Sequence, residues 1–218
     1  MESLEPSAFA LVMAFNHVGI ACFQQGRARI AWDLFKGALE VARDEEHLRE
    51  NLTPDSSNRY VRQAHYHLQN AGTYTKCSDA PSCLLRALSL NTTMEDEEWA
   101  NLYLAPSPFE ISMSMPLRPA IASVIFNLGL VTQLSNRESS QVIKLYQLAI
   151  SLVDTAESPK LAMAILNNMA VGYAESGDTE AAQLCMFELT RVEEPNDTRI
   201  QANVHMILSA YHQVAPAA

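Results

Sequence analysis

The sequence has little of what nucleic-acid-binding proteins and enzymes need. It contains 15 Lys and Arg against 25 Asp and Glu, which gives a formal net charge of −10. Nucleic-acid affinity depends on clustered Lys and Arg, and the sequence contains no such cluster. His65 and His67 are two residues apart, so on a helix they point about 200° apart and cannot act together. No Ser or Cys beside the isolated histidines forms a nucleophile motif. We therefore expect no nucleic-acid partner, no catalysis and no small-molecule substrate.

Metal-binding patterns are also missing. The four cysteines form no C-x-x-C pair and have no His at zinc-finger spacing; they are Cys22, Cys77, Cys83 and Cys185. The acidic run 95–98 lacks the alternating oxygen ligands and the glycine of a calcium loop. The sequence thus predicts no metal site and no cofactor.

Long hydrophobic runs are absent as well. No run reaches the 18 or so apolar residues that a membrane span requires. The apolar stretch 7–24 resembles a signal peptide, but it has no basic leader and follows the acidic residues Glu2 and Glu5. We expect a soluble, cytoplasmic protein without membrane insertion.

Glycine and aromatic residues are few, which leaves a helix-rich composition. The 218 residues include seven glycines and 7% aromatic residues, and 48% of the chain is hydrophobic. Ala and Leu dominate the periodic runs. A chain of this length can bury a real core, and the composition predicts an all-α protein.

The clearest supersecondary unit is the stretch 161–189, LAMAILNNMAVGYAESGDTEAAQLCMFEL. Apolar residues recur at helical spacing on both sides of the pair Gly177 and Asp178. The small residues Ala170 and Ala182 fall where two antiparallel helices would cross most closely. This stretch therefore predicts a helical hairpin with a tight turn.

This hairpin resembles the tetratricopeptide repeat (TPR). Its string NNMAVGYAESGDTEAAQL is most similar to the repeats of kinesin light chains, and the residues that match the pattern in type or size are Ala170, Tyr173, Ala182 and Met186. Leu189 replaces the expected final Ala. The resemblance implies a right-handed α-solenoid built from antiparallel hairpins.

Two further stretches repeat the pattern. In 15–39 the spacings of 12, 16 and 19 are kept by Gly19, Ala31, Phe35 and Ala38. In 126–150 the matching residues are Gly129, Tyr146 and Ala149, with one extra residue in the turn. The amphipathic run 199–213 has no second helix after it and is typical of a terminal cap.

We therefore predict one TPR-like domain over 1–218. Its predicted parts are hairpin 1 at 7–44, an irregular insert with short helices and an extended segment at 45–115, hairpin 2 at 116–155, hairpin 3 at 158–194 and a capping helix at 197–213. Within the insert, prolines surround an alternation of apolar and polar residues, whose apolar members are Phe109, Ile111, Met113 and Met115. Period-two alternation between prolines predicts an extended segment with one apolar face. We expect it to pack along or beside the concave groove of the helices.

One polar pattern repeats with the hairpins. Alignment of the first helices places His17, Asn127, Asn168 and Asn203 at one repeat position. In proteins that the chain resembles, asparagines at this position line the concave groove and bind the backbone of an extended peptide. An amide offers both a donor and an acceptor, which suits the N–H and C=O of a peptide. Asparagine also suits crowded helix contacts, so a structural role stays open. Arg199 could add a cation for an acidic group.

The sequence thus favours a protein-interaction module that binds an extended peptide or partner segment along its concave face. The alternative is a structural subunit of a larger assembly, whose groove is filled by its own insert and whose outer face docks on other proteins. An enzyme is the third possibility, but no acid, base or nucleophile pair supports it.

Overall fold

The described part of the protein is all-α. The computed structural model describes residues 8–48, 102–135, 139–192 and 197–214, and within these ranges it contains seven helices and no strand. The helices are α1 (Ala8–Gln24), α2 (Ala28–Leu48), α5 (Leu117–Leu134), α6 (Ser139–Ser151), α7 (Pro159–Glu175), α8 (Thr179–Val192) and α9 (Thr198–Val214). The part of the predicted insert at 49–101, where short helices are expected, lies outside the described residues.

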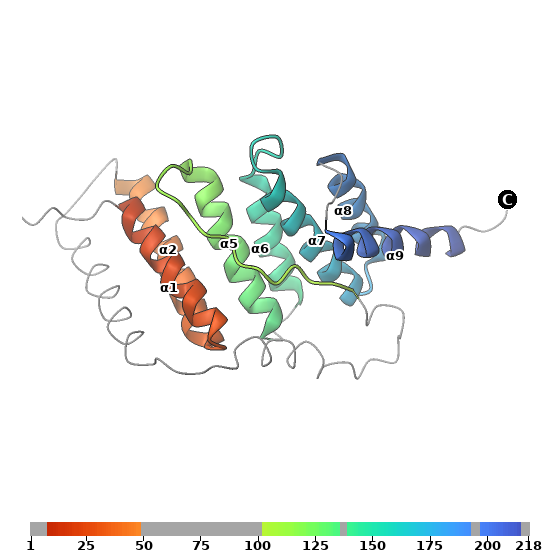
Figure 1. The fold of residues 1–218 in the computed structure, drawn as a ribbon, viewed down its shortest axis with the longest axis horizontal. Helices are drawn as coiled ribbons and strands as arrows, with labels where there is room; N and C mark the ends of the chain where they lie inside the picture. The colour runs from red at the N-terminus through yellow and green to blue at the C-terminus, as the bar shows by residue number, and fades with distance from the viewer. Residues whose placement is uncertain (1–7, 49–101, 136–138, 193–196, 215–218) are drawn as a thin grey trace, which may run out of the picture.

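The helices stand side by side in chain order, from α1 and α2 at one end to α8 and α9 at the other (Figure 1). Each described helix contacts the next one along the chain, and α5 also contacts both α1 and α7. The first helices of the three pairs therefore form a row, with the second helices α2, α6 and α8 packed against them. Buried side chains from all of these helices form one apolar core.

The turns of the first and third pairs have the same geometry. Gly26 and Gly177 have φ values of 73° and 81°, a conformation that glycine adopts without steric cost. In each turn the glycine N–H and the next N–H donate to carbonyls of the preceding helix, at 2.9–3.0 Å. This pattern is the Schellman motif, which ends a helix and reverses the chain. The turn that the sequence predicts at Gly177 is confirmed.

The helix pairs cross where glycine faces an aromatic ring. A Cβ atom placed on Gly19 would lie 2.6 Å from Cε1 of Phe35, and one on Gly129 would lie 2.8 Å from Cε1 of Tyr146. In the third pair the corresponding residues are Ala170 and Met186, both fully buried. In this pair Ala170 is larger than the glycines at the other crossings, and the flexible side chain of Met186 replaces the aromatic ring. The crossing therefore stays filled.

Two helices begin at residues that favour a helix start. Ser158 precedes α7, with Pro159 in its first turn. Asp197 caps α9, because its Oδ1 accepts a hydrogen bond of 2.9 Å from the Arg199 N–H. Helix α2 extends to Leu48, beyond the predicted end of the first hairpin.

Helix α5 is mostly apolar. Among the described helices it alone is long and apolar enough to cross a membrane, and 67% of it is buried inside the protein. A buried core helix passes the same test of length and composition. The cytoplasmic location stays a prediction.

Candidate functional site

An extended segment, residues 102–111, crosses the row of first helices. It runs from the side of α9 and α7 towards α5 and α1, opposite to the chain order of the helices (Figure 1). The chain then turns at residues 112–115, where the Met115 N–H donates to the Ser112 carbonyl at 3.0 Å, and α5 begins directly afterwards. We call residues 102–111 the groove segment.

Three asparagines on three different helices each bind one residue of the groove segment through both amide atoms. Asn203 on α9 accepts from the Tyr103 N–H at 2.8 Å and donates to its carbonyl at 2.6 Å. Asn168 on α7 does the same with Ala105, at 2.8 and 3.1 Å. Asn127 on α5 binds Phe109 in this way, at 2.8 and 2.9 Å. The side chains therefore recognise the peptide backbone.

Two further asparagines strengthen the end positions. Asn167 donates to the Tyr103 carbonyl at 3.0 Å and accepts from Asn203 at 2.8 Å. At the other end, Asn16 on α1 donates to the Phe109 carbonyl at 3.0 Å and accepts from Asn127 at 2.8 Å. Each end carbonyl thus accepts two amide hydrogen bonds. We call these five residues, Asn16, Asn127, Asn167, Asn168 and Asn203, the asparagine ladder.

The asparagine ladder lies deep in the protein. All five side chains are at most 1% exposed. A buried amide without hydrogen-bond partners costs about 1–3 kcal/mol. The backbone of the groove segment supplies these partners, so the ladder and the segment form one satisfied polar layer between apolar side chains.

The prolines of the groove segment match the spacing of the ladder. In an extended chain, the N–H and C=O of alternate residues face the same edge. The bound residues Tyr103, Ala105 and Phe109 are all odd-numbered, whereas Pro106 and Pro108 fall on even positions. The prolines lack an N–H, but they lie between the bound residues, so no hydrogen bond to the ladder is lost. Proline also keeps its own φ and the preceding residue in the extended region, which favours the bound conformation.

Apolar contacts fix the segment at its α5 end. The Phe109 ring meets Phe126 edge-on with a centroid distance of 5.2 Å, and Phe126 lies 5.8 Å from Tyr146. Ile111 is only 2% exposed. Phe109 and Ile111 therefore pack on the helices beside the ladder.

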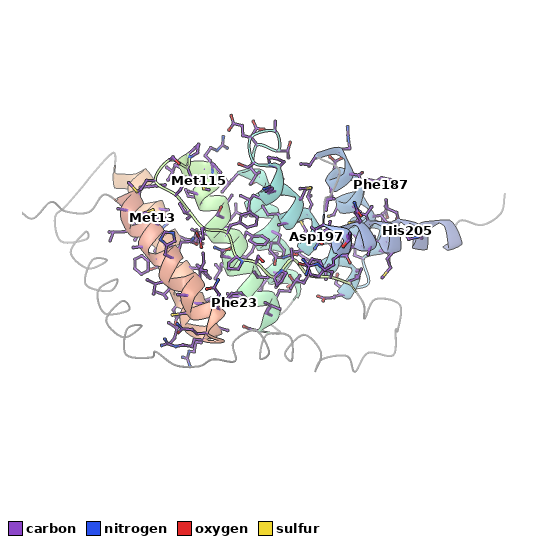
Figure 2. The ribbon with its side chains drawn as sticks, viewed as in Figure 1. Met13, Phe23, Met115, Phe187, Asp197 and His205 are labelled. Carbon is purple, nitrogen blue, oxygen red and sulfur yellow. The ribbon has the colours of Figure 1, made fainter. Side chains whose placement is uncertain are left out.

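The predicted apolar face does not continue past Ile111. Met113 is 64% exposed, so its assignment to the packed face is wrong. Met115 packs against the core next to the start of α5 (Figure 2). The reason is the turn at 112–115, which ends the period-two alternation, and in which the hydroxyl groups of Ser112 and Ser114 hydrogen-bond to each other at 3.0 Å.

The predicted ladder position on α1 is also wrong by one residue. His17 is exposed, and Asn16 makes the contact instead. Successive helix residues differ by 100° in direction, so a shift of one position moves a side chain to another face. Asn16 and Asn167 each lie one position before the aligned site, where α5 and α9 have Phe126 and Ala202, so the repeat alignment gave no signal for them.

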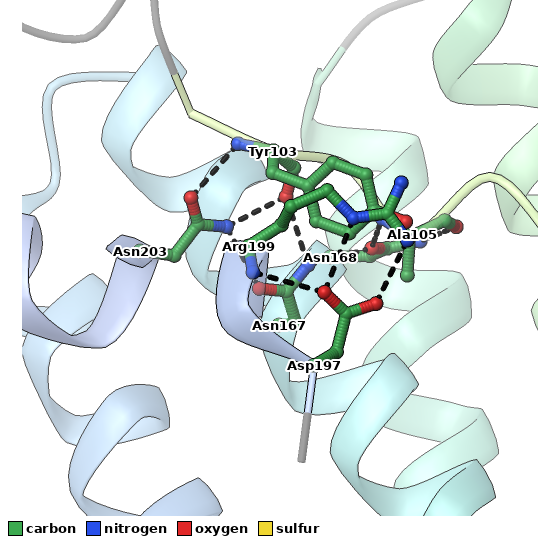
Figure 3. A network of polar contacts seen from close by, with 7 residues as sticks. All are labelled: Tyr103, Ala105, Asn167, Asn168, Asp197, Arg199 and Asn203. Atoms are coloured by element: carbon green, nitrogen blue, oxygen red, sulfur yellow. Dashed lines mark hydrogen bonds and ion pairs between the residues drawn. The ribbon is translucent and has the colours of Figure 1, made fainter. Parts of the chain in front are cut away.

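Arg199 has a different partner from the one expected. Its guanidinium bonds to the Asp197 carboxylate at 2.9 and 3.1 Å and lies 4.2 Å from the centroid of the Tyr103 ring (Figure 3). The side-chain hydrogen bonds from Arg199 hold the pKa of Asp197 below its ordinary value. Burial raises the pKa of Tyr103, and the positive charge of Arg199 partly offsets this effect. Arg199 therefore covers the segment's first bound residue and pairs with an acidic group of its own chain.

Groups with catalytic chemistry are sparse around the groove segment. Within the described ranges, no three His, Cys, Asp or Glu side chains gather as a metal site would need. Burial raises the pKa of the Cys22 thiol, and burial followed by the charge of Asp178 raises the pKa of Cys185 to about 12. Both thiols are buried and therefore stay protonated at neutral pH.

Comparisons of the chain with family models, with curated proteins and with solved structures found no match.

Proposed function

We propose that this protein is a non-catalytic interaction scaffold whose helices form a TPR-like right-handed α-solenoid with a peptide-binding groove along its concave face. The groove is closed by the groove segment at rest. A partner protein opens it by supplying an extended peptide that replaces this segment. The protein acts without a cofactor, and nucleic acid and membranes are not its partners.

The observation that carries this proposal is the paired amide contact of three asparagines with one backbone. Asn127, Asn168 and Asn203 each bind both the N–H and the C=O of a single residue in the groove segment. Such contacts do not depend on the side chains of the bound peptide. A site that holds one extended peptide by its backbone can hold another of compatible shape.

The groove segment is a strong competitor because it belongs to the same chain. Residues 112–116 connect it to α5, so its effective concentration is in the millimolar range expected for a short linker. An external peptide with the same contacts would bind weakly to the unchanged protein. Binding is therefore expected to depend on the release of the segment.

A full-length variant with Phe109→Ser and Ile111→Ser tests this proposal. Both changes remove apolar contacts of the segment and leave the asparagines in place. The probe is a fluorescein-labelled peptide of residues 102–111, LYLAPSPFEI, and fluorescence anisotropy measures its binding. We expect the variant to keep its helical circular dichroism and to bind the probe at least about tenfold more tightly than the unchanged protein.

Met113→Ser is the matched control, because Met113 lies beyond the bound residues and is exposed. It should bind the probe as weakly as the unchanged protein does. If the double variant with Phe109→Ser and Ile111→Ser stays helical but binds no probe, the proposal is contradicted.

A second candidate function is an accessory subunit whose groove stays filled. Leu184 and Phe187 favour it, because they are three residues apart on α8, are 61% and 51% exposed, and so offer an apolar surface. Figure 2 shows Phe187 on this helix. Under this function the same double variant should bind no probe, and adding the probe should not restore any stability that the variant has lost.

A further inference from the structure

We infer that the partner peptide carries a defined pattern: an aromatic residue, a small residue two positions later, a phenylalanine four positions after that, and a branched aliphatic residue two positions further. Prolines are accepted between the bound positions and rejected at them. This inference rests on the proposed function. It takes the groove segment as a template for the ligand, which is a peptide of a different protein.

The first part of the pattern follows from the backbone contacts. The ladder needs an N–H at the positions of Tyr103, Ala105 and Phe109, because Asn203, Asn168 and Asn127 each accept one hydrogen bond there. Proline has no N–H and would leave a buried amide oxygen without this donor. Within the described residues, no side chain hydrogen-bonds to the backbone of Ser107, which is exposed. Proline is therefore compatible with position 107 as well as with 106 and 108.

The second part follows from the side chains around these contacts. At the α9 end the Arg199 guanidinium lies over the ring of Tyr103, which favours an aromatic residue. At the α5 end Phe126 meets Phe109 edge-on, and the Ile111 side chain is buried. Ala105 lies between them, half-buried, where Asn168 holds both of its backbone groups. Because Ala105 is partly buried and packs against the core, a small side chain is favoured at this central position.

The direction of the peptide is also defined. The segment's first bound residue contacts α9 and its last contacts α5 and α1. A peptide read in the opposite direction would place its phenylalanine beside Arg199 and its first aromatic residue beside Phe126. The pattern is therefore directional.

The test uses the full-length variant with Phe109→Ser and Ile111→Ser and a set of labelled peptides of equal composition. In one peptide the order of Ala105 and Pro106 is reversed (LYLPASPFEI), which places proline at a ladder position. In the matched control the order of Ser107 and Pro108 is reversed (LYLAPPSFEI), which places proline between ladder positions. A reversed and a scrambled sequence complete the set.

We expect the first exchange to weaken binding about tenfold, since it removes one N–H donor from a buried acceptor. The control should bind within about threefold of the parent peptide, because it keeps every ladder bond. The reversed and scrambled peptides should bind weakly.

Equal affinity for all peptides would overturn the pattern but would leave the proposed function standing, since the groove would still bind peptides. If no peptide binds, the proposed function itself fails. The double variant could also dimerise as its concentration rises. If the dimer excludes the peptides and the monomer does not, the occupant is a second copy of the chain, and the inference of a separate partner is overturned.

Discussion

The two ends of the groove segment have the same backbone contacts and different side-chain contacts. At each end, one asparagine binds both backbone groups of a residue and a second asparagine adds a bond to its carbonyl. Around Phe109 the side-chain contacts are aromatic and the neighbouring Ile111 is buried. Around Tyr103 they are an exposed guanidinium and the buried Leu104. The comparison indicates that the asparagines define the position of the peptide, whereas the apolar side chains decide how strongly each end is held.

The largest expected effect is at the apolar end. Ile111→Ala should lower the free energy of unfolding by about 2–5 kcal/mol, because it removes most of a buried side chain and leaves a cavity. Met113→Ala, two residues away and exposed, should change it by no more than about 0.5 kcal/mol. Denaturant titration measures both. Similar losses in the two variants would mean that residue 111 is not packed in the core.

The next effect concerns the glycine that lies against this apolar end. In Gly129→Ala the new methyl group would meet the Tyr146 ring at 2.8 Å, and this ring lies beside Phe126, which contacts Phe109. We expect a loss of about 1–3 kcal/mol from overpacking, measured by thermal unfolding.

Gly19→Ala is the matched control for this change, since its methyl group would meet Phe35 at 2.6 Å in another helix pair. It should destabilise the protein by a similar amount. Only Gly129→Ala should also shift the nuclear magnetic resonance signals of the Phe109 ring. Shifts of equal size in both variants would show that the Phe109 ring is not specifically coupled to the helix crossing at Gly129.

The ladder positions should respond alike at the two ends. Asn127→Ala and Asn203→Ala each remove two bonds to the backbone, and each leaves a second asparagine on the carbonyl. We expect each to lower the free energy of unfolding by about 0.5–1.5 kcal/mol per lost bond, and the two losses to agree within about 0.5 kcal/mol. Denaturant titration of both variants tests this symmetry. A large loss in one variant alone would show that the surrounding side chains, and not the asparagine hydrogen bonds, determine how strongly that end of the segment is held.

The smallest effect is expected at the exposed end and depends on pH. Hydrogen bonds from Arg199 lower the pKa of Asp197 in the folded state. The folded protein therefore binds this proton less readily than the unfolded chain, and the stabilisation is present above the ordinary pKa of 3.8 and lost as the pH falls through the folded value. Arg199→Ala should reduce this acid sensitivity and slightly lower the melting temperature at neutral pH. Identical acid unfolding curves for the two proteins would exclude a role of this pair.

The sequence predicted the local features well, because they depend on neighbouring residues. The turn at Gly177 follows from glycine between two periodic runs, and the small residues opposite bulky ones mark the helix crossings. The contact of an extended segment with the helices was also predicted, from the prolines and the apolar alternation around Phe109.

Non-local features were harder to predict. The predicted segment began at Phe109, whereas Tyr103 and Ala105 also bind the ladder. Leu102 to Ala105 show no alternation, and their place depends on asparagines up to 100 residues away. The side chain that faces the extended segment also depends on the rotation of each helix, which is why the prediction of His17 is wrong and Asn16 makes the contact.

Amide hydrogen exchange resolved by nuclear magnetic resonance tests the central claim most directly. The asparagine ladder binds the N–H groups of Tyr103, Ala105 and Phe109, and Ser107 lies among them without a ladder contact. We predict that the three bound amides exchange at least about tenfold more slowly than that of Ser107, since each 1.4 kcal/mol of opening free energy slows exchange about tenfold. Equally fast exchange at all four positions would show that the ladder does not hold this segment.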